Sequence, residues 1–166
     1  MRLNQYRTTD EKWMHLALEQ AKIAFQENEV PVGAVVRIGD DLIGLGRNAA
    51  MQTSDPTSHA EINALRAACE IKQASKLAGA VLYVTLEPCL MCAGALLNAR
   101  ISELVFGARD SSRGAAGSVI DALQTGWLNH RIKVTSGVCD DKASALLSTF
   151  FQELRQKDSF HLHPRD

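Results

Sequence analysis

Two short motifs, His-Ala-Glu at residues 59–61 and Pro-Cys-Leu-Met-Cys at residues 88–92, carry side chains that can bind a metal and move protons. Cys89 and Cys92 are three residues apart at the start of a predicted helix, so both sulfurs lie on one side of that helix. The free amide groups and the dipole of a helix N-terminus favour thiolates, the form that a metal binds. His59 also lies near a predicted helix start, so these three side chains can converge on one zinc ion.

The number of predicted ligands indicates a catalytic metal site. Two cysteines and one histidine leave a fourth tetrahedral position for water, whereas four protein ligands mark a structural site. Zinc lowers the pKa of a bound water to about 7 and so provides hydroxide at neutral pH. Glu61, two residues after His59, can approach the metal without binding it and carry protons between water and substrate.

Each part of this pattern also has a simpler interpretation. The Cys-x-x-Cys spacing occurs in thioredoxin-like redox pairs and in halves of structural zinc sites, for which Cys69 or Cys139 would have to supply the remainder. His59 alone would be a surface or helix-end residue, and Glu61 alone a solvated charge. The combination of both motifs is hard to obtain from packing demands, so it favours the catalytic zinc site.

Length and composition are those of one globular domain. The chain has 166 residues, of which 46% are hydrophobic and 22% charged. We predict a single domain over residues 1–157 and a flexible C-terminal tail over 158–166. The sequence contains no run long and apolar enough for a membrane span and no signal-peptide core at its N-terminus, so we expect a cytoplasmic protein. The net charge of -1 gives no support to a nucleic-acid partner, although a local basic patch is compatible with it.

Strands and helices alternate along the predicted elements. A capping box at Thr8 and Glu11 begins a helix over 9–27, and a hairpin follows over 32–38 and 42–46. Asp55 and Pro56 read as the N-cap and first residue of a helix that continues to 71. Further strands are predicted at 80–86, 103–107 and 132–137, and further helices at 89–99 and 143–155. This order predicts an α/β fold, a three-layer α/β/α sandwich around one mixed five-stranded sheet.

His-x-Glu followed by Pro-Cys-x-x-Cys resembles the signature of the zinc-dependent nucleobase deaminases. Further segments resemble the tRNA-specific adenosine deaminases within that superfamily, and the likeness runs from about residue 9 to residue 156. The more discriminating segments are Phe-Gly-Ala-Arg-Asp at 106–110, Gly-Ala-Ala-Gly-Ser at 114–118 and Asn-His-Arg at 129–131. The other segments that resemble this family are residues 29–35, 59–66 and 85–95.

The resemblance implies a cytidine-deaminase-like fold and hydrolytic deamination of adenosine to inosine at the wobble position of a tRNA anticodon. It implies one Zn²⁺ per subunit, held by His59, Cys89 and Cys92, with Glu61 as the catalytic proton shuttle. It also implies a tRNA anticodon loop as partner and a symmetric homodimer formed around residues 89–99. The substrate-binding residues that it implies are Asn48, Asp110, Asn129, Phe151 and Arg155.

Other functions are compatible with the same motifs. A free-base or nucleoside deaminase, such as a guanine deaminase, would use the same zinc chemistry without RNA, and the near-neutral charge favours it. The second alternative is a zinc-stabilised RNA-binding module that has no catalytic activity.

If the homodimer uses the 89–99 helix, bulky charged residues at Ala95 or Leu96 should disrupt it. Candidate phosphate contacts are Lys22, Arg47, Arg109, Arg113, Arg131, Lys133, Arg155 and Lys157.

Overall fold

A computed structural model describes residues 8–126 and 129–161 of the chain, apart from the side chains of 158–161. Within these ranges the strands are β1 (Gly33–Ile38), β2 (Asp41–Arg47), β3 (Ala80–Leu86), β4 (Glu103–Ala108) and β5 (Lys133–Ser136). The helices are α1 (Thr9–Gln26), α2 (Ala50–Thr53), α3 (Ala60–Lys72), α4 (Leu90–Asn98) and α5 (Asp140–His161).

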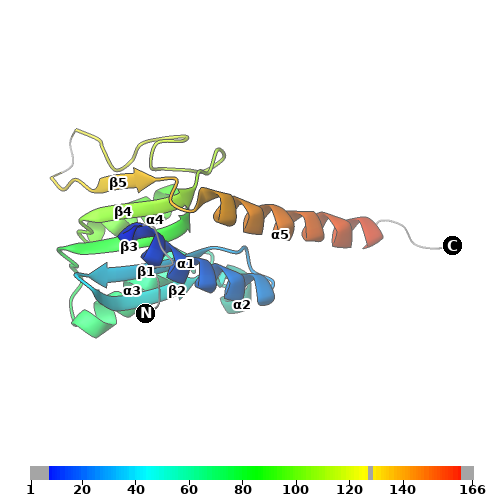
Figure 1. Cartoon of the computed structure of the whole chain (residues 1–166), viewed down its shortest axis with the longest axis horizontal. Coiled ribbons are helices and arrows are strands. Elements are labelled where there is room, and N and C mark those ends of the chain that lie inside the picture. The colour runs from blue at the N-terminus through cyan, green and yellow to red at the C-terminus, as the bar shows by residue number, and fades with distance from the viewer. Residues whose placement is uncertain (1–7, 127–128, 162–166) are drawn as a thin grey trace.

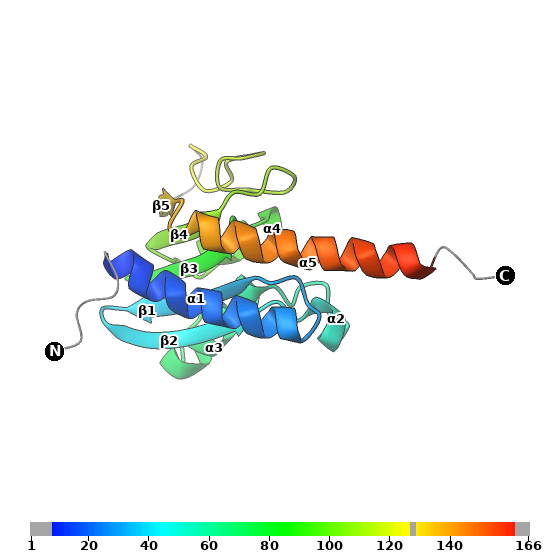
Figure 2. The same cartoon turned by 45° about the vertical axis from the view of Figure 1, so that its right-hand side comes forward.

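The strands form one mixed sheet in the order β2-β1-β3-β4-β5 (Figure 1). β1 is antiparallel to both β2 and β3, while β3–β4 and β4–β5 are parallel pairs. Helices α1 and α5 lie on one face of the sheet, and α3 and α4 lie on the other (Figure 2). The predicted three-layer α/β/α sandwich and its mixed sheet are therefore confirmed.

Side-chain alternation in the central strand β3 divides the core between the two faces. Leu82 and Val84 pack with α3 and α4, whereas Val81 and Tyr83 pack with α1 and α5. All four side chains are buried, as expected for a strand covered by helices on both faces. The two layers of helices thus anchor β3, whose C-terminal end leads directly into the cysteine motif.

The predicted start of the third helix is wrong. Instead of capping a helix, the Asp55 carboxylate accepts hydrogen bonds from the backbone N–H and the hydroxyl of Thr57, at 2.8 and 2.7 Å. This local turn competes with helical geometry, and the helix begins only at Ala60, with His59 as its N-cap residue. The shift matters because it moves His59 out of the helix and onto its end.

The last helix is longer than predicted. α5 begins at Asp140 rather than at 143, and it continues to His161, into the first residues of the expected tail. Residues 162–166 lie outside the described part of the chain, so the boundary between domain and tail stays a prediction. No helix in the part of the chain that the structure describes combines the length and apolar character needed to cross a membrane.

A close approach between β2 and α3 sets the depth of the site. Gly46 faces the start of α3 so closely that a Cβ atom there would overlap the carbonyl oxygen of Ala60 and the backbone nitrogen of Ala64. Glycine lets the two backbones approach, and the helix end that bears His59 lies against the sheet as a result.

Candidate active site

His59 and Cys89 occupy equivalent positions at the starts of two helices. Each is an N-cap residue with extended backbone, His59 for α3 and Cys89 for α4. In the described structure neither side chain caps its own helix, so both project into the space between the helix ends. Cys92 follows in the first turn of α4, where its sulfur shares a side with that of Cys89. The predicted convergence of the three side chains is thus present.

The geometry of the three donor atoms fits zinc. The His59 Nδ1 atom lies 3.6 Å from the Cys89 sulfur and 3.5 Å from the Cys92 sulfur. A tetrahedral ion with ordinary Zn–N and Zn–S bonds separates nitrogen and sulfur by about 3.6 Å. All three donors lie within 4.8 Å of one another. The chain therefore has a His/Cys/Cys site that can hold a metal ion.

The thiols have very different acidities in the protein itself. Hydrogen bonds from Cys92 and then from His59 lower the pKa of Cys89 to about 3. The hydrogen bond to Cys89, together with burial, raises the pKa of Cys92. The bond with Cys89 also raises the pKa of His59. Cys89 is therefore a ready thiolate ligand, and a divalent cation would favour deprotonation of Cys92 as well.

Glu61 lies in the first turn of α3, beside these donors, with only 4% of its surface exposed. Burial raises the pKa of its carboxyl to about 7, and the negative charge of Cys89 adds to the shift. A carboxyl with this pKa can both accept and release a proton near neutral pH, which is what a proton shuttle needs.

A pocket of about 200 Å³ opens above the donors. It is smaller than the pockets of about 300–1,000 Å³ that take drug-sized ligands, so it suits one small planar group such as a nucleobase. The residues that line it are Glu29, Val30, Val32, Asn48, Ala50, Met51, His59, Ala60, Glu61, Leu86, Glu87, Cys89, Asp110 and Arg113.

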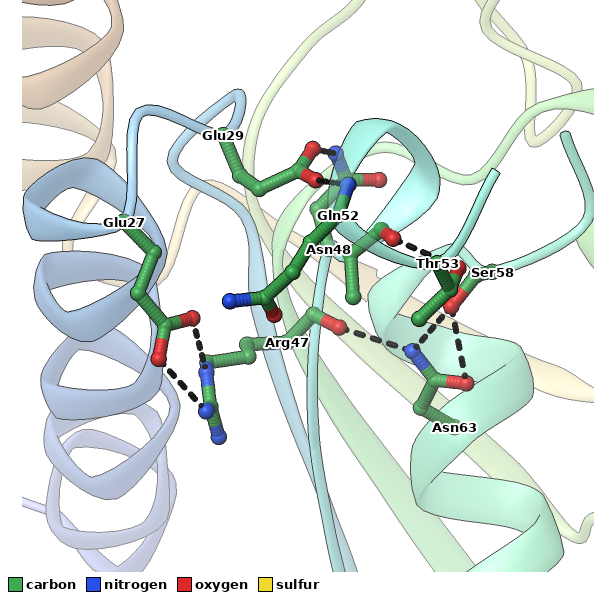
Figure 3. Close-up of polar contacts among 9 residues, drawn as sticks. Glu27, Glu29, Arg47, Asn48, Gln52, Thr53, Ser58 and Asn63 are labelled. Carbon is green, nitrogen blue, oxygen red and sulfur yellow. Dashed lines mark hydrogen bonds and ion pairs between the residues drawn. The ribbon is translucent and has the colours of Figure 1, made fainter. Parts of the chain in front are cut away.

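Asn48 is buried in this lining and has a fixed orientation. Its amide nitrogen donates a 2.9 Å hydrogen bond to Glu29, whose other carboxylate oxygen accepts the N–H of Gln52 at 2.7 Å (Figure 3). Because a carboxylate only accepts hydrogen bonds, the atom of the Asn48 amide that faces Glu29 must be the nitrogen, and the amide oxygen points the other way. A polar amide of known orientation can then discriminate between donors and acceptors on the edge of a base.

Asp110 also lines the pocket, and its side chain holds the following residues in a tight loop. One carboxylate oxygen accepts from the Ser112 N–H and hydroxyl and from the Arg113 N–H, at 2.7–3.0 Å. Burial alone would raise the pKa of Asp110, but these hydrogen bonds outweigh it and lower the pKa. Arg113, one of the predicted phosphate contacts, joins it in the lining.

Three of the predicted substrate-binding residues lie outside the pocket. Among the described residues, its lining does not include Asn129, Phe151 or Arg155. Asn129 is exposed, and so is Phe151, which packs edge-on against Phe150 on α5. Their roles as RNA contacts stay predictions.

Three of the predicted phosphate contacts pair with carboxylates of the protein, namely Lys22, Arg47 and Lys133. Arg47 donates two hydrogen bonds of 2.7 Å to the carboxylate of Glu27, at the end of α1 (Figure 3). This two-pronged pair holds the guanidinium against the protein and leaves it poorly placed for a phosphate.

Sequence reasoning missed two buried acids, Glu29 and Glu87, that line the pocket. Their positions in the sequence could have indicated a role at the site, because each acid comes shortly before a proline within a segment that resembles known deaminases. Their partners are backbone N–H groups and the side chains of Asn48 and Ser118, all of them far along the chain, so no local pattern reveals them.

Comparison with known proteins identifies the family. The model of the MafB19-like deaminases matches residues 8–155. The tRNA-specific adenosine deaminase of Haemophilus influenzae is 50% identical over 149 residues, which cover 89% of this chain and 86% of that protein. The Bacillus subtilis tRNA-specific adenosine deaminase is 41% identical, with coverage of 90% and 93%.

Solved structures agree with this assignment. One from a study of A-to-I editing by tRNA:A34 deaminases at the wobble position matches with a TM-score of 0.79 and 40% identity, over 82% of this chain and 99% of that one. A guanine deaminase from Nitrosomonas europaea has a TM-score of 0.74 but 26% identity, over 90% and 88%. The chain therefore belongs to the deaminase family that includes the tRNA-specific adenosine deaminases.

Proposed function

We propose that this protein hydrolyses adenosine to inosine and ammonia at the wobble position of a tRNA anticodon. The observation that carries the proposal is the buried Glu61 carboxyl, with a pKa of about 7, beside a three-donor metal site in a pocket of nucleobase size. The choice of adenosine in tRNA rests on the relatives of 40–50% identity, whereas the guanine deaminase is much more distant.

The metal of the proposal is one Zn²⁺ held by His59, Cys89 and Cys92, where it would supply a hydroxide nucleophile at neutral pH. Glu61 accepts a proton from the attacking water and delivers it to a ring nitrogen of the base. Glu61 then takes a second proton from the hydroxyl group added to the carbon and transfers it to the departing amine, so that the net reaction consumes water and releases ammonia. The amide of Asn48 holds the polar edge of the purine during both transfers.

The substrate would present its base without melting a duplex, because anticodon loops hold unstacked bases that can be turned outward. The small pocket takes the flipped base, and Asp110 and Arg113 meet the nucleotides that flank it. Asn129, Phe151 and Arg155 would extend this contact to the rest of the loop.

We also infer a homodimer that uses α4, in a protein that works in the cytoplasm. Two apolar side chains at the start of this helix support the interface, because Leu90 is 60% exposed and Met91 is 37% exposed. Leu96 cannot serve as the test site suggested by the sequence, since it is fully buried in the core of its own subunit. A charge there would destabilise the fold whether or not a dimer forms.

The direct test of the proposed chemistry is Glu61→Gln, which keeps the size of the side chain and removes its acid-base function. We expect turnover of an anticodon stem-loop to fall by about 10²–10⁴-fold, with zinc content and thermal stability retained. Glu70→Gln is the matched control, because Glu70 is exposed on the same helix and should leave turnover unchanged. Full turnover by Glu61→Gln would contradict the assignment of Glu61 as the proton shuttle.

A further inference from the structure

Glu87 is a buried acid in the linker that joins the central strand to the metal-binding turn. It follows Leu86, the last residue of β3, and precedes Pro88 and Cys89. Only 2% of its surface is exposed. A buried carboxylate needs several hydrogen-bond donors, so the identity of those donors shows what the residue holds in place.

Among the residues that the structure describes, the donors to the Glu87 carboxylate all come from one distant loop, residues 110–118. Its Oε1 atom accepts the N–H groups of Ala116 and Ser118, at 3.1 and 3.0 Å. Its Oε2 atom accepts the N–H of Asp110 at 3.1 Å and the hydroxyl of Ser118. Hydrogen bonds to an ionised acceptor are stronger than neutral ones, so a single side chain fixes both ends of the 110–118 loop.

The middle of the loop packs closely against the same carboxylate. A Cβ atom on Gly114 would lie 2.5 Å from the Glu87 carboxyl carbon and 2.6 Å from Oε2. Only glycine allows the loop to close around the acid at this distance. Next to Gly114, the N–H of Ala115 donates a 2.8 Å hydrogen bond to the carbonyl of Pro88, which adds a second link to the linker.

This loop carries Asp110 and Arg113 into the lining of the pocket, which also includes Asn48. Glu87 itself stands two residues from Cys89. One side chain therefore connects the metal-binding turn to the part of the pocket that would meet the nucleotides next to the target base.

We propose that Glu87 is a positioning residue for the RNA substrate. It holds the 110–118 loop at a fixed place relative to Cys89, so that Asp110 and Arg113 face the flanking nucleotides while the base occupies the pocket. The inference rests on the proposed function. Its consequence is that loss of the Glu87 carboxylate weakens productive binding of RNA more than it slows the chemical step, which depends on Glu61.

The first test is Glu87→Gln, which keeps the shape but replaces one acceptor oxygen with an NH₂ group that faces N–H donors. We expect the KM for an anticodon stem-loop to rise by about tenfold or more, while kcat stays within about threefold and the zinc content is unchanged. Glu70→Gln, which neutralises an exposed acid on α3, should match the wild type in all three quantities.

Two further variants approach the same contact from the loop. Ser118→Ala removes one of the four hydrogen bonds and should raise the KM less than Glu87→Gln does. Gly114→Ala places a methyl group against the carboxylate and should shift the loop as Glu87→Gln does. If Glu87→Gln does not fold, Ser118→Ala still decides the question, because an unchanged KM with that variant would overturn the proposal.

Hydrogen exchange provides a readout that does not require activity. In Glu87→Gln, the amides of Asp110, Ala116 and Ser118 should exchange faster, whereas those of α4 should keep their wild-type rates. Unchanged exchange in the loop would overturn the proposal, as would a fall in kcat together with loss of zinc, which would assign Glu87 to the metal turn alone. If the wild type fails to deaminate the stem-loop, the proposed function fails, and the exchange still decides whether Glu87 holds the loop.

Discussion

The close approach of β2 to α3 makes Gly46→Ala an informative perturbation. The added Cβ would overlap the Ala60 carbonyl oxygen and the Ala64 nitrogen, and it would lie 3.0 Å from the Ala64 Cα atom. These are backbone atoms of a regular helix, so no side chain can rotate away to relieve the overlap. Ordinary contact begins at 3.4 Å, and α3 would therefore have to withdraw by about 1 Å.

Two quantities should change as a result. Overpacking of this kind costs about 1–3 kcal/mol in the free energy of unfolding. Ligand positions in metal sites are defined to about 0.2 Å, so a shift of α3 also moves His59 away from Cys89 and Cys92. We expect zinc affinity to fall by at least about tenfold, because the histidine no longer meets the sulfurs at bonding distance.

The assay combines urea unfolding with a zinc titration against a chromophoric chelator. Gly126→Ala is the control, since no atom of the residues that the structure describes lies within 4 Å of a Cβ at Gly126 and its φ is not in the left-handed region. That variant should match the wild type in both measurements. If Gly46→Ala instead keeps wild-type stability and zinc affinity, the close packing of β2 against α3 does not set the position of His59, and this account of the site is wrong.

Three other predictions concern stability, assembly and the metal. Burial and the hydrogen bond to Asp10 raise the pKa of Tyr83 to about 12 from 10.0, so the folded chain keeps a proton that the unfolded chain loses. The stability that this phenol contributes is therefore complete below pH 10 and is lost as the pH rises toward 12. Tyr83→Phe should show a shallower fall in the free energy of unfolding over that pH range. An equally steep fall in the variant would contradict this role of Tyr83. Met91→Asp, at an exposed position on α4, should halve the mass measured by light scattering, and an unchanged dimer mass would move the interface elsewhere. Zinc at 100 times its Kd should raise the free energy of unfolding by about 2.7 kcal/mol relative to the metal-free protein, and no shift would contradict a metal site in the folded chain.

The sequence was most informative where a pattern is local. The β-branched run that became β1 and the apolar run that became β3 were predicted within a residue or so, since alternation and turn residues act over a few positions. The approach of His59 to the cysteines was also expected, because both motifs were predicted to lie near helix starts, which can face each other beside neighbouring strands. The predicted family was confirmed by the relatives, while the individual roles of the site residues stay predictions.

Sequence patterns failed where a competing turn or a distant partner decides the structure. Asp55 has the sequence signature of a helix cap, but its hydrogen bonds to Thr57 form a turn first. The short helix α2 was missed because it is held by Glu29, whose carboxylate accepts the N–H of Gln52, 23 residues away. Glu87 was missed for the same reason, since its donors lie 23–31 residues away.

The measurement that tests the central claim most directly is a deamination assay with purified, zinc-loaded protein. An anticodon stem-loop with adenosine at the wobble position would be offered in parallel with free guanine, adenosine and cytidine, and the products would be identified by mass spectrometry. The account predicts inosine at the wobble position of the stem-loop and no turnover of the free compounds. Turnover of a free base or nucleoside with the RNA untouched would contradict it, and would make the protein a small-molecule deaminase with the same zinc chemistry.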